Sequence, residues 1–242
     1  MREHSLAEEA TVVQGVIRSS WVRAVPMLAG LPEEFLGRIR SYATLWQAQL
    51  DRPLYFKDDP ENFVAFILCG SVHHVLRGAD GRELIHDSNA AGELVGEAAL
   101  FDSQKRSSAA FATAGSELML VARSHFSWLH AEPEFLKRAQ KLLCQRLRDA
   151  AEFTESIGMY CLESRLARHI LHQAQLHGVT AQDGIVVPLP GNQSTLASMV
   201  NASRPKLNVQ LRQWRRSGLI RSQKTSLVIS DLEQLKRIAR AA

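Results

Sequence analysis

Cysteine and long apolar runs are scarce in this sequence. The three cysteines, Cys69, Cys144 and Cys161, have no metal-ligand spacing, and we expect them to be reduced thiols that serve in packing. The longest apolar run, Phe63 to Cys69, is far shorter than the roughly 20 residues needed to cross a bilayer. The first ten residues carry acids where a signal peptide would have a basic start and an apolar stretch. These absences predict a cytoplasmic protein with no membrane partner.

Acidic residues are missing from one long segment near the C-terminus. Residues 184–230 contain no Asp or Glu and seven Lys or Arg. Residues 1–132 hold 12 basic and 17 acidic residues, a net charge of −5, whereas residues 133–242 hold 17 and 8, a net charge of +9. This asymmetry predicts two domains with different partners. The basic domain suits a polyanion, because phosphate contacts dominate nucleic-acid affinity.

Catalytic and metal motifs are also missing. The sequence has no P-loop, no G-x-S-x-G, no H-E-x-x-H and no paired zinc cysteines, so we expect neither an enzyme nor a metal site.

The apolar pattern changes character along the chain. Up to about Leu50 it predicts helices, with Leu36, Ile39 and Trp46 at helical spacing. From about residue 53 to 121, short apolar runs are separated by glycines, and the Asp80-Gly81 pair is a hairpin-turn signal. This region predicts an antiparallel barrel or sandwich.

A long helix is predicted from Pro133 to about Gly158, with a heptad seam. The seam residues are spaced alternately by four and three: Leu143, Leu147, Ala150, Thr154, Ile157 and Cys161. The seam predicts a parallel homodimer; packing of the same stripe on the chain's own barrel is the alternative.

The C-terminal region predicts two helices joined by a tight turn. A helix over residues 162–177 and a strand over 185–187 come first. A short helix over 193–200 is followed by Asn201, which tolerates the left-handed conformation that such a turn needs, and by a second helix from Ser203 to Gly218. Two short strands follow. Helix, turn, helix and hairpin make a winged helix-turn-helix.

With this segment in place, the chain resembles the Crp/Fnr family of bacterial transcription regulators from about residue 29 to 230. Residues 92–109, GELVGEAALFDSQKRSSA, resemble the family's phosphate-binding cassette. The resemblance implies an α+β fold: an N-terminal antiparallel β-helix or jelly-roll sensor domain (1–132), a long dimerisation helix (133–160) and a C-terminal winged helix-turn-helix (161–242).

The resemblance also implies a site for a cyclic nucleotide, such as cyclic AMP or cyclic GMP. It assigns Arg106 and Ser107 to the phosphate, Glu97 to the ribose, Gly96 to close backbone approach, and main-chain donors to the segment that includes Ala98 and Ala99. An ordinary ion pair between Glu97 and Arg106 is the structural alternative.

Five effector-site positions depart from the family pattern. The positions that match nucleobase contacts are Ala150 and Ala151, which have no hydroxyl, and the apolar wall is replaced by His74, His86 and Asn89. We therefore expect weak binding of cyclic AMP, with another cyclic nucleotide or an unrelated anion as the better ligand. Haem is disfavoured, because the cassette is intact and no clear axial Cys or Met partner accompanies His74.

The recognition helix resembles the family's at Arg204, which would read guanine. Gln193, Ser203, Lys206 and Lys224 are candidates for phosphate contacts. The next family positions depart, with Pro205 where an acid is usual and Val209 where arginine is frequent, so the DNA half-site should differ from the best-known consensus.

Together these features predict a homodimeric regulator that binds double-stranded DNA, with RNA polymerase as a further partner implied by the resemblance. An effector would bias the recognition helices toward half-sites about 34–36 Å apart, with a hinge near residues 158–162. Two alternatives stay open. One is a regulator of this fold that binds DNA without a ligand, and the other is a cyclic-nucleotide module that acts on a protein partner.

Overall fold

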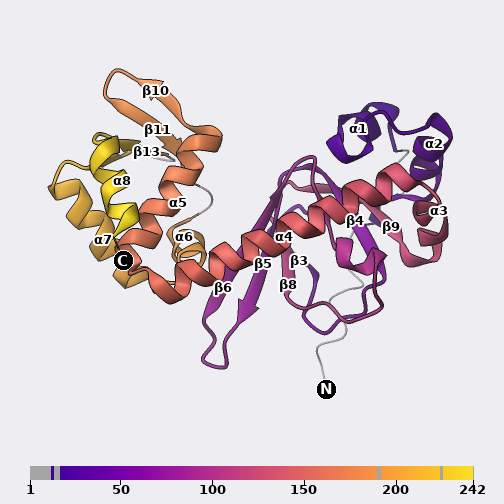
Figure 1. Ribbon diagram of the computed structural model, residues 1–242, viewed down its shortest axis with the longest axis horizontal. Helices are drawn as coiled ribbons and strands as arrows, with labels where there is room; N and C mark the ends of the chain where they lie inside the picture. The colour runs from indigo at the N-terminus through magenta and orange to yellow at the C-terminus, as the bar shows by residue number, and fades with distance from the viewer. Residues whose placement is uncertain (1–11, 14–16, 190–191, 224–225, 242) are drawn as a thin grey trace. The chain divides into compact units, whose positions relative to one another are not determined.

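The computed structural model describes residues 12–13, 17–189, 192–223 and 226–241 (Figure 1). The chain forms two compact units. The first unit is Met1–Leu76 with His86–Arg148, and the second is Arg77–Ile85 with Asp149–Ala242. Helix α4, Pro133–Met159, runs across this division. The domain boundaries predicted at residues 132 and 160 stay a proposal.

Two antiparallel sheets build the first unit in the part of the chain that the structure describes. The strand orders are β1-β2-β9-β4-β7 and β3-β8-β5-β6. The strand bounds are β1 Val12–Val13, β2 Thr44–Gln47, β3 Arg52–Tyr55, β4 Phe63–Cys69, β5 Ser71–Arg77, β6 Glu83–Ala90, β7 Leu94–Val95, β8 Ala109–Ala112 and β9 Glu117–Ala122. The hairpin turn predicted at Asp80-Gly81 is confirmed, since it joins β5 to β6 and Gly81 has a φ of 76°. The predicted antiparallel β domain is thus confirmed.

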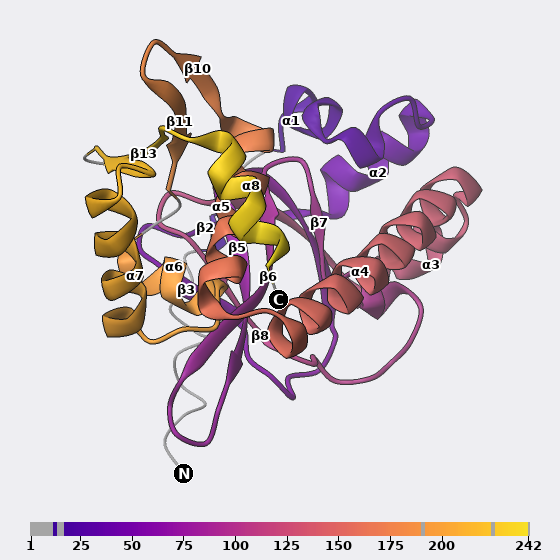
Figure 2. The same ribbon diagram turned by 60° about the vertical axis from the view of Figure 1, so that its left-hand side comes forward.

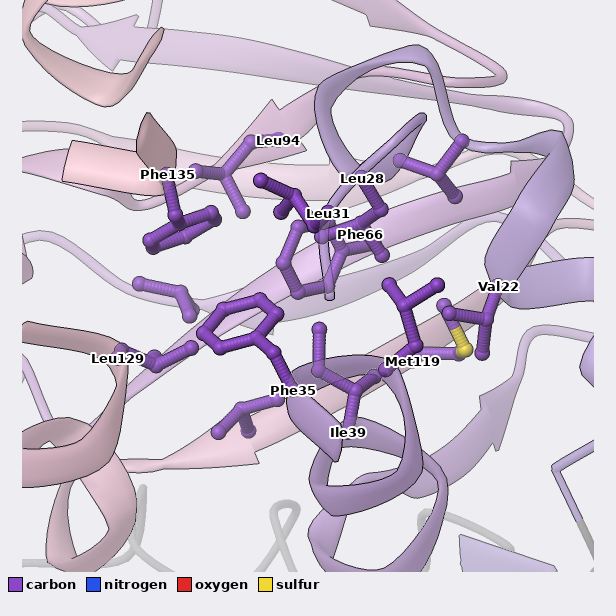
Figure 3. Packing of buried hydrophobic residues seen from close by; sticks show 14 of the residues in the cluster. Val22, Leu28, Leu31, Phe35, Ile39, Phe66, Leu94, Met119, Leu129 and Phe135 are labelled. Carbon is purple, nitrogen blue, oxygen red and sulfur yellow. The ribbon is translucent and has the colours of Figure 1, made fainter. Parts of the chain in front are cut away.

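The apolar side chains of the first unit form two layers. One layer includes Trp46, Ile67, Val72 and Leu118 from both sheets. The other lies where the first sheet is covered by the helices α1 Ser19–Ala24, α2 Glu33–Tyr42 and α3 Phe126–His130 and by the start of α4. Figure 3 shows this second layer, with Phe35, Phe66 and Phe135 close together.

The expectation of helix up to Leu50 is wrong in its last part. Leu36 and Ile39 are buried on α2, as their spacing predicts, but α2 ends at Tyr42. Trp46 lies on β2, where it pairs with Leu118 of β9, and its side chain is 4% exposed. The spacing of seven residues from Ile39 to Trp46 satisfies helical periodicity, but Ala43 has an extended backbone that ends the helix, and β2 begins at the next residue.

The second unit has its own apolar core. Helix α5, Leu162–His177, matches the predicted bounds, and Leu166, Ile170 and Trp214 belong to the core. A sheet of order β10-β11-β13-β12 lies beside it in the described residues. The remaining bounds are β10 Val179–Ala181, β11 Gly184–Pro188, α6 Gln193–Met199, α7 Arg204–Arg216, β12 Ile220–Ser222, β13 Ser226–Ile229 and α8 Leu232–Arg240. Helix α8, which packs against α5, and strand β10 have no counterpart in the sequence predictions (Figure 2).

Candidate functional site

The glycine and glutamate of the predicted phosphate cassette come directly after strand β7. Gly96 follows the strand with a φ of 79°, a left-handed conformation that favours glycine, and the short helix η2, Glu97–Leu100, starts next. A Cβ atom at position 96 would collide with Nη1 of Arg106. Gly96 is therefore needed both for the turn and for close approach to the arginine. Ala99 is buried, and Ala98 is half-buried.

Arg106 lies at the other end of the cassette with its side chain almost fully buried. Its Nη2 donates to the carbonyl oxygen of Phe63 at 2.6 Å, and Nη1 is 3.9 Å from Oε1 of Glu61. The guanidinium carbon lies over two rings, 4.2 Å from the centroid of Tyr55 and 4.9 Å from that of Phe63. Its Nε has no hydrogen-bond partner among the described residues. The guanidinium thus keeps donor capacity that an anion would use. Ser107, predicted to assist it, is exposed.

Glu97 forms an ion pair with an arginine that was not predicted from the sequence. Arg146 of α4 brings Nε to 3.6 Å from Oε1 of Glu97, and its other nitrogens lie 3.2 Å from Asp87 and 3.4 Å from Glu93. Burial raises the pKa of Glu97, and the charge of Arg146 opposes this. The alternative of a direct Glu97–Arg106 ion pair is absent from the described residues, since each pairs elsewhere. Arg146 precedes Ala150 by one helical turn, and this spacing is a signal that could have found it.

The residues of the predicted polar wall lie on β5 and β6, and His74 among them is neutral. Asn89 donates through Nδ2 to Oε2 of Glu93 at 2.8 Å, so its Oδ1 must accept, and the Nε2 of His74 donates to it at 2.9 Å. Burial lowers the pKa of His74 to about 4. At pH 7 its Nδ1 is therefore an acceptor. The ring of His86 lies 5.9 Å from that of His74.

The two alanines predicted at nucleobase contacts lie on α4 in the second unit, and both are exposed. The carbonyl of Ala150 accepts from Oγ1 of Thr154 at 2.7 Å. The structure groups the cassette, Glu97, Arg106 and the histidine wall within the first unit.

The helix-turn-helix forms as predicted. Asn201 has a φ of 50°, and the amide of Ala202 donates to the carbonyl of Ala197 at 2.9 Å. Helix α7 begins after Ser203, which is the N-cap residue but makes no side-chain capping bond, and it buries Leu207, Leu211 and Trp214. The predicted DNA-facing residues Gln193, Ser203, Arg204 and Lys206 are all exposed. Lys224 lies outside the described residues.

Two residues of α5 hold this motif, and neither was predicted. Arg165 donates to the carbonyls of Tyr160, Val200 and Asn201 at 2.7, 3.0 and 3.3 Å, which ties the start of α5 to the turn. Glu163 accepts from Nε1 of Trp214 at 2.8 Å and from Nε2 of Gln210 at 3.1 Å, which ties α5 to α7. Both contacts depend on packing between segments far apart in the chain, so no local signal marks them.

In a single chain the cysteines do not pack, contrary to expectation; for Cys161, which is also a residue of the predicted seam, burial between two chains stays a proposal. Cys69, Cys144 and Cys161 are free thiols at exposed positions, because each lies at the end of a strand or on an uncovered helix face or terminus. In the described ranges no group of three or more His, Cys, Asp or Glu is placed to hold a metal ion. None of the helices described here is long and apolar enough to cross a membrane.

Comparisons with known proteins find matches to both the β domain and the helix-turn-helix. A cyclic nucleotide-binding domain model matches residues 47–132, and a Crp-like helix-turn-helix domain model matches residues 164–238. The CRP-like cAMP-activated global transcriptional regulator of Mycobacterium tuberculosis is 28% identical over 188 residues, which cover 77% of this chain and 84% of the relative. The cAMP-activated global transcriptional regulator CRP of Pasteurella multocida is 24% identical and covers 68% of this chain and 79% of its own length.

Solved structures show the same fold. FixK2 of Bradyrhizobium japonicum superposes with a TM-score of 0.70 at 20% identity, over 83% of this chain and 98% of that one. The c-di-GMP responsive global regulator CLP of Xanthomonas campestris has the same TM-score and identity, over 83% of this chain and all of that one. The chain thus has a β domain that matches the cyclic nucleotide-binding model, followed by a Crp-like helix-turn-helix, and relatives match it along most of its length. The chain therefore belongs to the Crp/Fnr family and is a DNA-binding transcription regulator.

Proposed function

We propose that this regulator is a homodimer whose affinity for its operator is controlled by a cyclic nucleotide bound in the first unit. The observation that carries the effector proposal is the buried guanidinium of Arg106. Its Nε has no hydrogen-bond partner in the part of the chain that the structure describes, and the guanidinium packs directly against the backbone at Gly96. A buried arginine is suited to a phosphodiester, since its donors match phosphate oxygens and its charge is permanent. Glu97, the first residue of η2, is the proposed partner of a ribose hydroxyl.

The relatives support a cyclic nucleotide, since their names describe them as activated by cAMP. We nevertheless propose that cyclic AMP is a weak ligand here. Ala150 and Ala151 supply no hydroxyl, and losing one or two buried hydrogen bonds lowers affinity roughly 5- to 150-fold. The neutral His74 offers an acceptor in place of an apolar contact. Cyclic GMP or an unrelated anion is the proposed better ligand.

The dimer proposal rests on the surface of α4. Among the seam residues on this helix, Leu147 is 74% exposed, and Leu143 and Ile157 are only partly covered. A second copy of α4 would bury this stripe through the predicted heptad seam. We propose that the protein acts by binding alone, without catalysis. Contact with RNA polymerase belongs to this proposal through membership of a family of transcription regulators.

Calorimetric titration of the full chain with cyclic AMP and cyclic GMP tests the effector, followed by DNA binding with and without each ligand. We expect measurable binding of a cyclic nucleotide, a change in DNA affinity on its addition, and loss of binding in Arg106→Ala. Tight binding of cyclic AMP would refute the weak-ligand proposal. No binding of either nucleotide, with DNA affinity unchanged, would favour the regulator that works without a ligand.

A further inference from the structure

Glu61 is a buried carboxylate that the proposed function leaves without a role. Its side chain is 7% exposed, and the partner in its ion pair is Arg106, whose side chain is 2% exposed. A buried carboxylate is costly unless a counter-ion and hydrogen bonds compensate it. Here compensation is incomplete: the closest approach is 3.9 Å, and Oε2 of Glu61 has no hydrogen-bond partner among the described residues.

The backbone around Glu61 holds this carboxylate beside Arg106. The amide of Asp58 donates to the carbonyl of Arg106, and the amide of Arg106 donates to the carbonyl of Asp59, both at 2.9 Å. The carbonyl of Glu61 accepts from Nη1 of Arg123 at 2.7 Å. The segment that carries Glu61 is therefore bonded to Arg106, the partner in its ion pair, and to Arg123, which follows β9. These bonds, two between main-chain groups and one from the side chain of Arg123, hold the segment in addition to the ion pair.

We infer that Glu61 is an internal counter-ion of Arg106 that competes with the phosphate of the effector and thereby sets the concentration at which the effector binds. This inference rests on the proposed function, in which Arg106 meets the phosphate. One guanidinium facing both a carboxylate and a phosphodiester in a buried site gains less from each, because the two anions repel. The phosphate must displace or weaken the contact between Arg106 and Glu61. The free energy that this requires lowers the affinity for the effector.

The same pair of residues should also discriminate between nucleotides that differ in the charge of their phosphate. A cyclic phosphodiester carries one negative charge, whereas an open-chain 5′-monophosphate carries nearly two at neutral pH. The carboxylate of Glu61 repels the second charge as well as the first. The protein should therefore prefer the cyclic form over 5′-AMP or 5′-GMP, and part of this preference should depend on Glu61.

The experiment titrates full-length native protein and variants with cyclic AMP, cyclic GMP and the two 5′-monophosphates by calorimetry. Glu61→Gln keeps the shape of the side chain and removes its charge. Glu33→Gln is the matched control, since it removes one charge from an exposed ion pair with Arg23. Arg106→Gln and the double variant Glu61→Gln/Arg106→Gln test whether any effect of Glu61 passes through Arg106. Circular dichroism verifies folding, and Glu61→Ala replaces Glu61→Gln if the latter does not fold.

We expect Glu61→Gln to bind the cyclic nucleotide about 5- to 150-fold more tightly than native protein, the usual range for coupling between interacting groups. Its preference for the cyclic form over the 5′-monophosphate should shrink. Glu33→Gln should bind as native protein does, and both variants that lack Arg106 should lose binding.

Equal or weaker binding by Glu61→Gln, with loss of binding in Arg106→Gln, would overturn the counter-ion inference and leave the proposed effector site intact. Binding that survives in Arg106→Gln would overturn the proposed phosphate contact, and the inference with it. If neither native protein nor Glu61→Gln binds any of these nucleotides, both the effector proposal and the inference are wrong.

Discussion

Arg106 and Arg146 are buried to different degrees and differ in how their charge is compensated. Arg146 faces three carboxylates, those of Asp87, Glu93 and Glu97, at 3.2 to 3.6 Å. Arg106 has one carboxylate, at 3.9 Å, and an Nε without a partner among the described residues. An incoming anion gains most where the existing compensation is weakest, so Arg106 is the better anion site of the two. We expect Arg146 to orient Glu97, since its Nε lies 3.6 Å from Oε1 of that residue.

Arg204 is the residue expected to specify DNA sequence. Arg204→Ala should weaken binding to the preferred operator by about 1–3 kcal/mol and relax base preference at one position in each half-site, because a bidentate contact to guanine is lost. Selection of preferred sites from a random DNA library, followed by anisotropy measurements, gives both quantities.

Lys206 is the matched comparison, since it is exposed two residues later on the same helix. Lys206→Ala should weaken binding to all sequences alike and reduce its salt dependence, as expected for a phosphate contact. If Arg204→Ala leaves base preference unchanged, the predicted reading residue is wrong.

His169 on α5 should make the second unit sensitive to acid. Burial lowers its pKa from 6.5 to about 4, and its Nε2 has no hydrogen-bond partner among the described residues. The unfolded chain therefore binds a proton at a higher pH than the folded chain does. The contribution of the neutral His169 to the free energy of unfolding is fully present above about pH 6.5. It is lost as the pH falls toward 4, by about 3 kcal/mol in total.

Scanning calorimetry between pH 7.5 and 4.5 measures this loss. His169→Leu should flatten the pH dependence of the transition that belongs to the second unit. An unchanged slope in this variant would contradict the assignment, whatever happens to its stability at pH 7.5.

At the scale of elements, helix α7 depends on α5 for its position. The indole nitrogen of Trp214 and the amide of Gln210 both donate to one oxygen of Glu163. Trp214 is 3% exposed, so its N–H depends on this acceptor for a hydrogen bond. Glu163 thus links the start of α5 to the recognition helix.

Glu163→Leu should destabilise the second unit by about 1–3 kcal/mol, because it leaves a buried indole N–H unpaired. Glu163→Gln retains an acceptor oxygen and should recover most of this loss. Chemical denaturation followed by calorimetry or fluorescence compares the two variants. Equal losses in both would mean that the charge of Glu163, and not its acceptor oxygen, matters.

At the scale of the whole molecule, α4 carries an apolar stripe that a single chain leaves uncovered. Leu147 is central to the predicted seam and 74% exposed, so its replacement should not disturb the fold of one chain. Leu147→Asp places a charge without a partner into the proposed dimer interface. Sedimentation velocity should then show monomer, and DNA affinity should fall sharply because the two half-sites are no longer bound together.

Leu176→Asp is the control for this change. Leu176 is also exposed, at 58%, but it lies near the end of α5, away from the predicted seam. This variant should stay dimeric. A Leu147→Asp protein that sediments like the native one would place the interface elsewhere.

Local signals in the sequence were sufficient for the regular elements around the sites. The left-handed turn at Asn201 and the Asp80-Gly81 hairpin are properties of a few consecutive residues, and the structure confirms both. The helical periodicity of residues 162–177 likewise matched α5. The same reasoning failed at Trp46, where a helical spacing continues by chance into a strand.

The sequence by itself thus determined the helix-turn-helix, helix α5 and the antiparallel strands of the first unit, because turns, caps and periodicity act within a few residues of the chain. Only the tertiary structure decided which charges meet. Arg146 reaches Asp87 across 59 positions, and Trp214 reaches Glu163 across 51. The pairing of Arg106 with Glu61 is of the same kind. Such contacts depend on how separate strands and helices pack, and packing brings together side chains between which the chain itself carries no local signal.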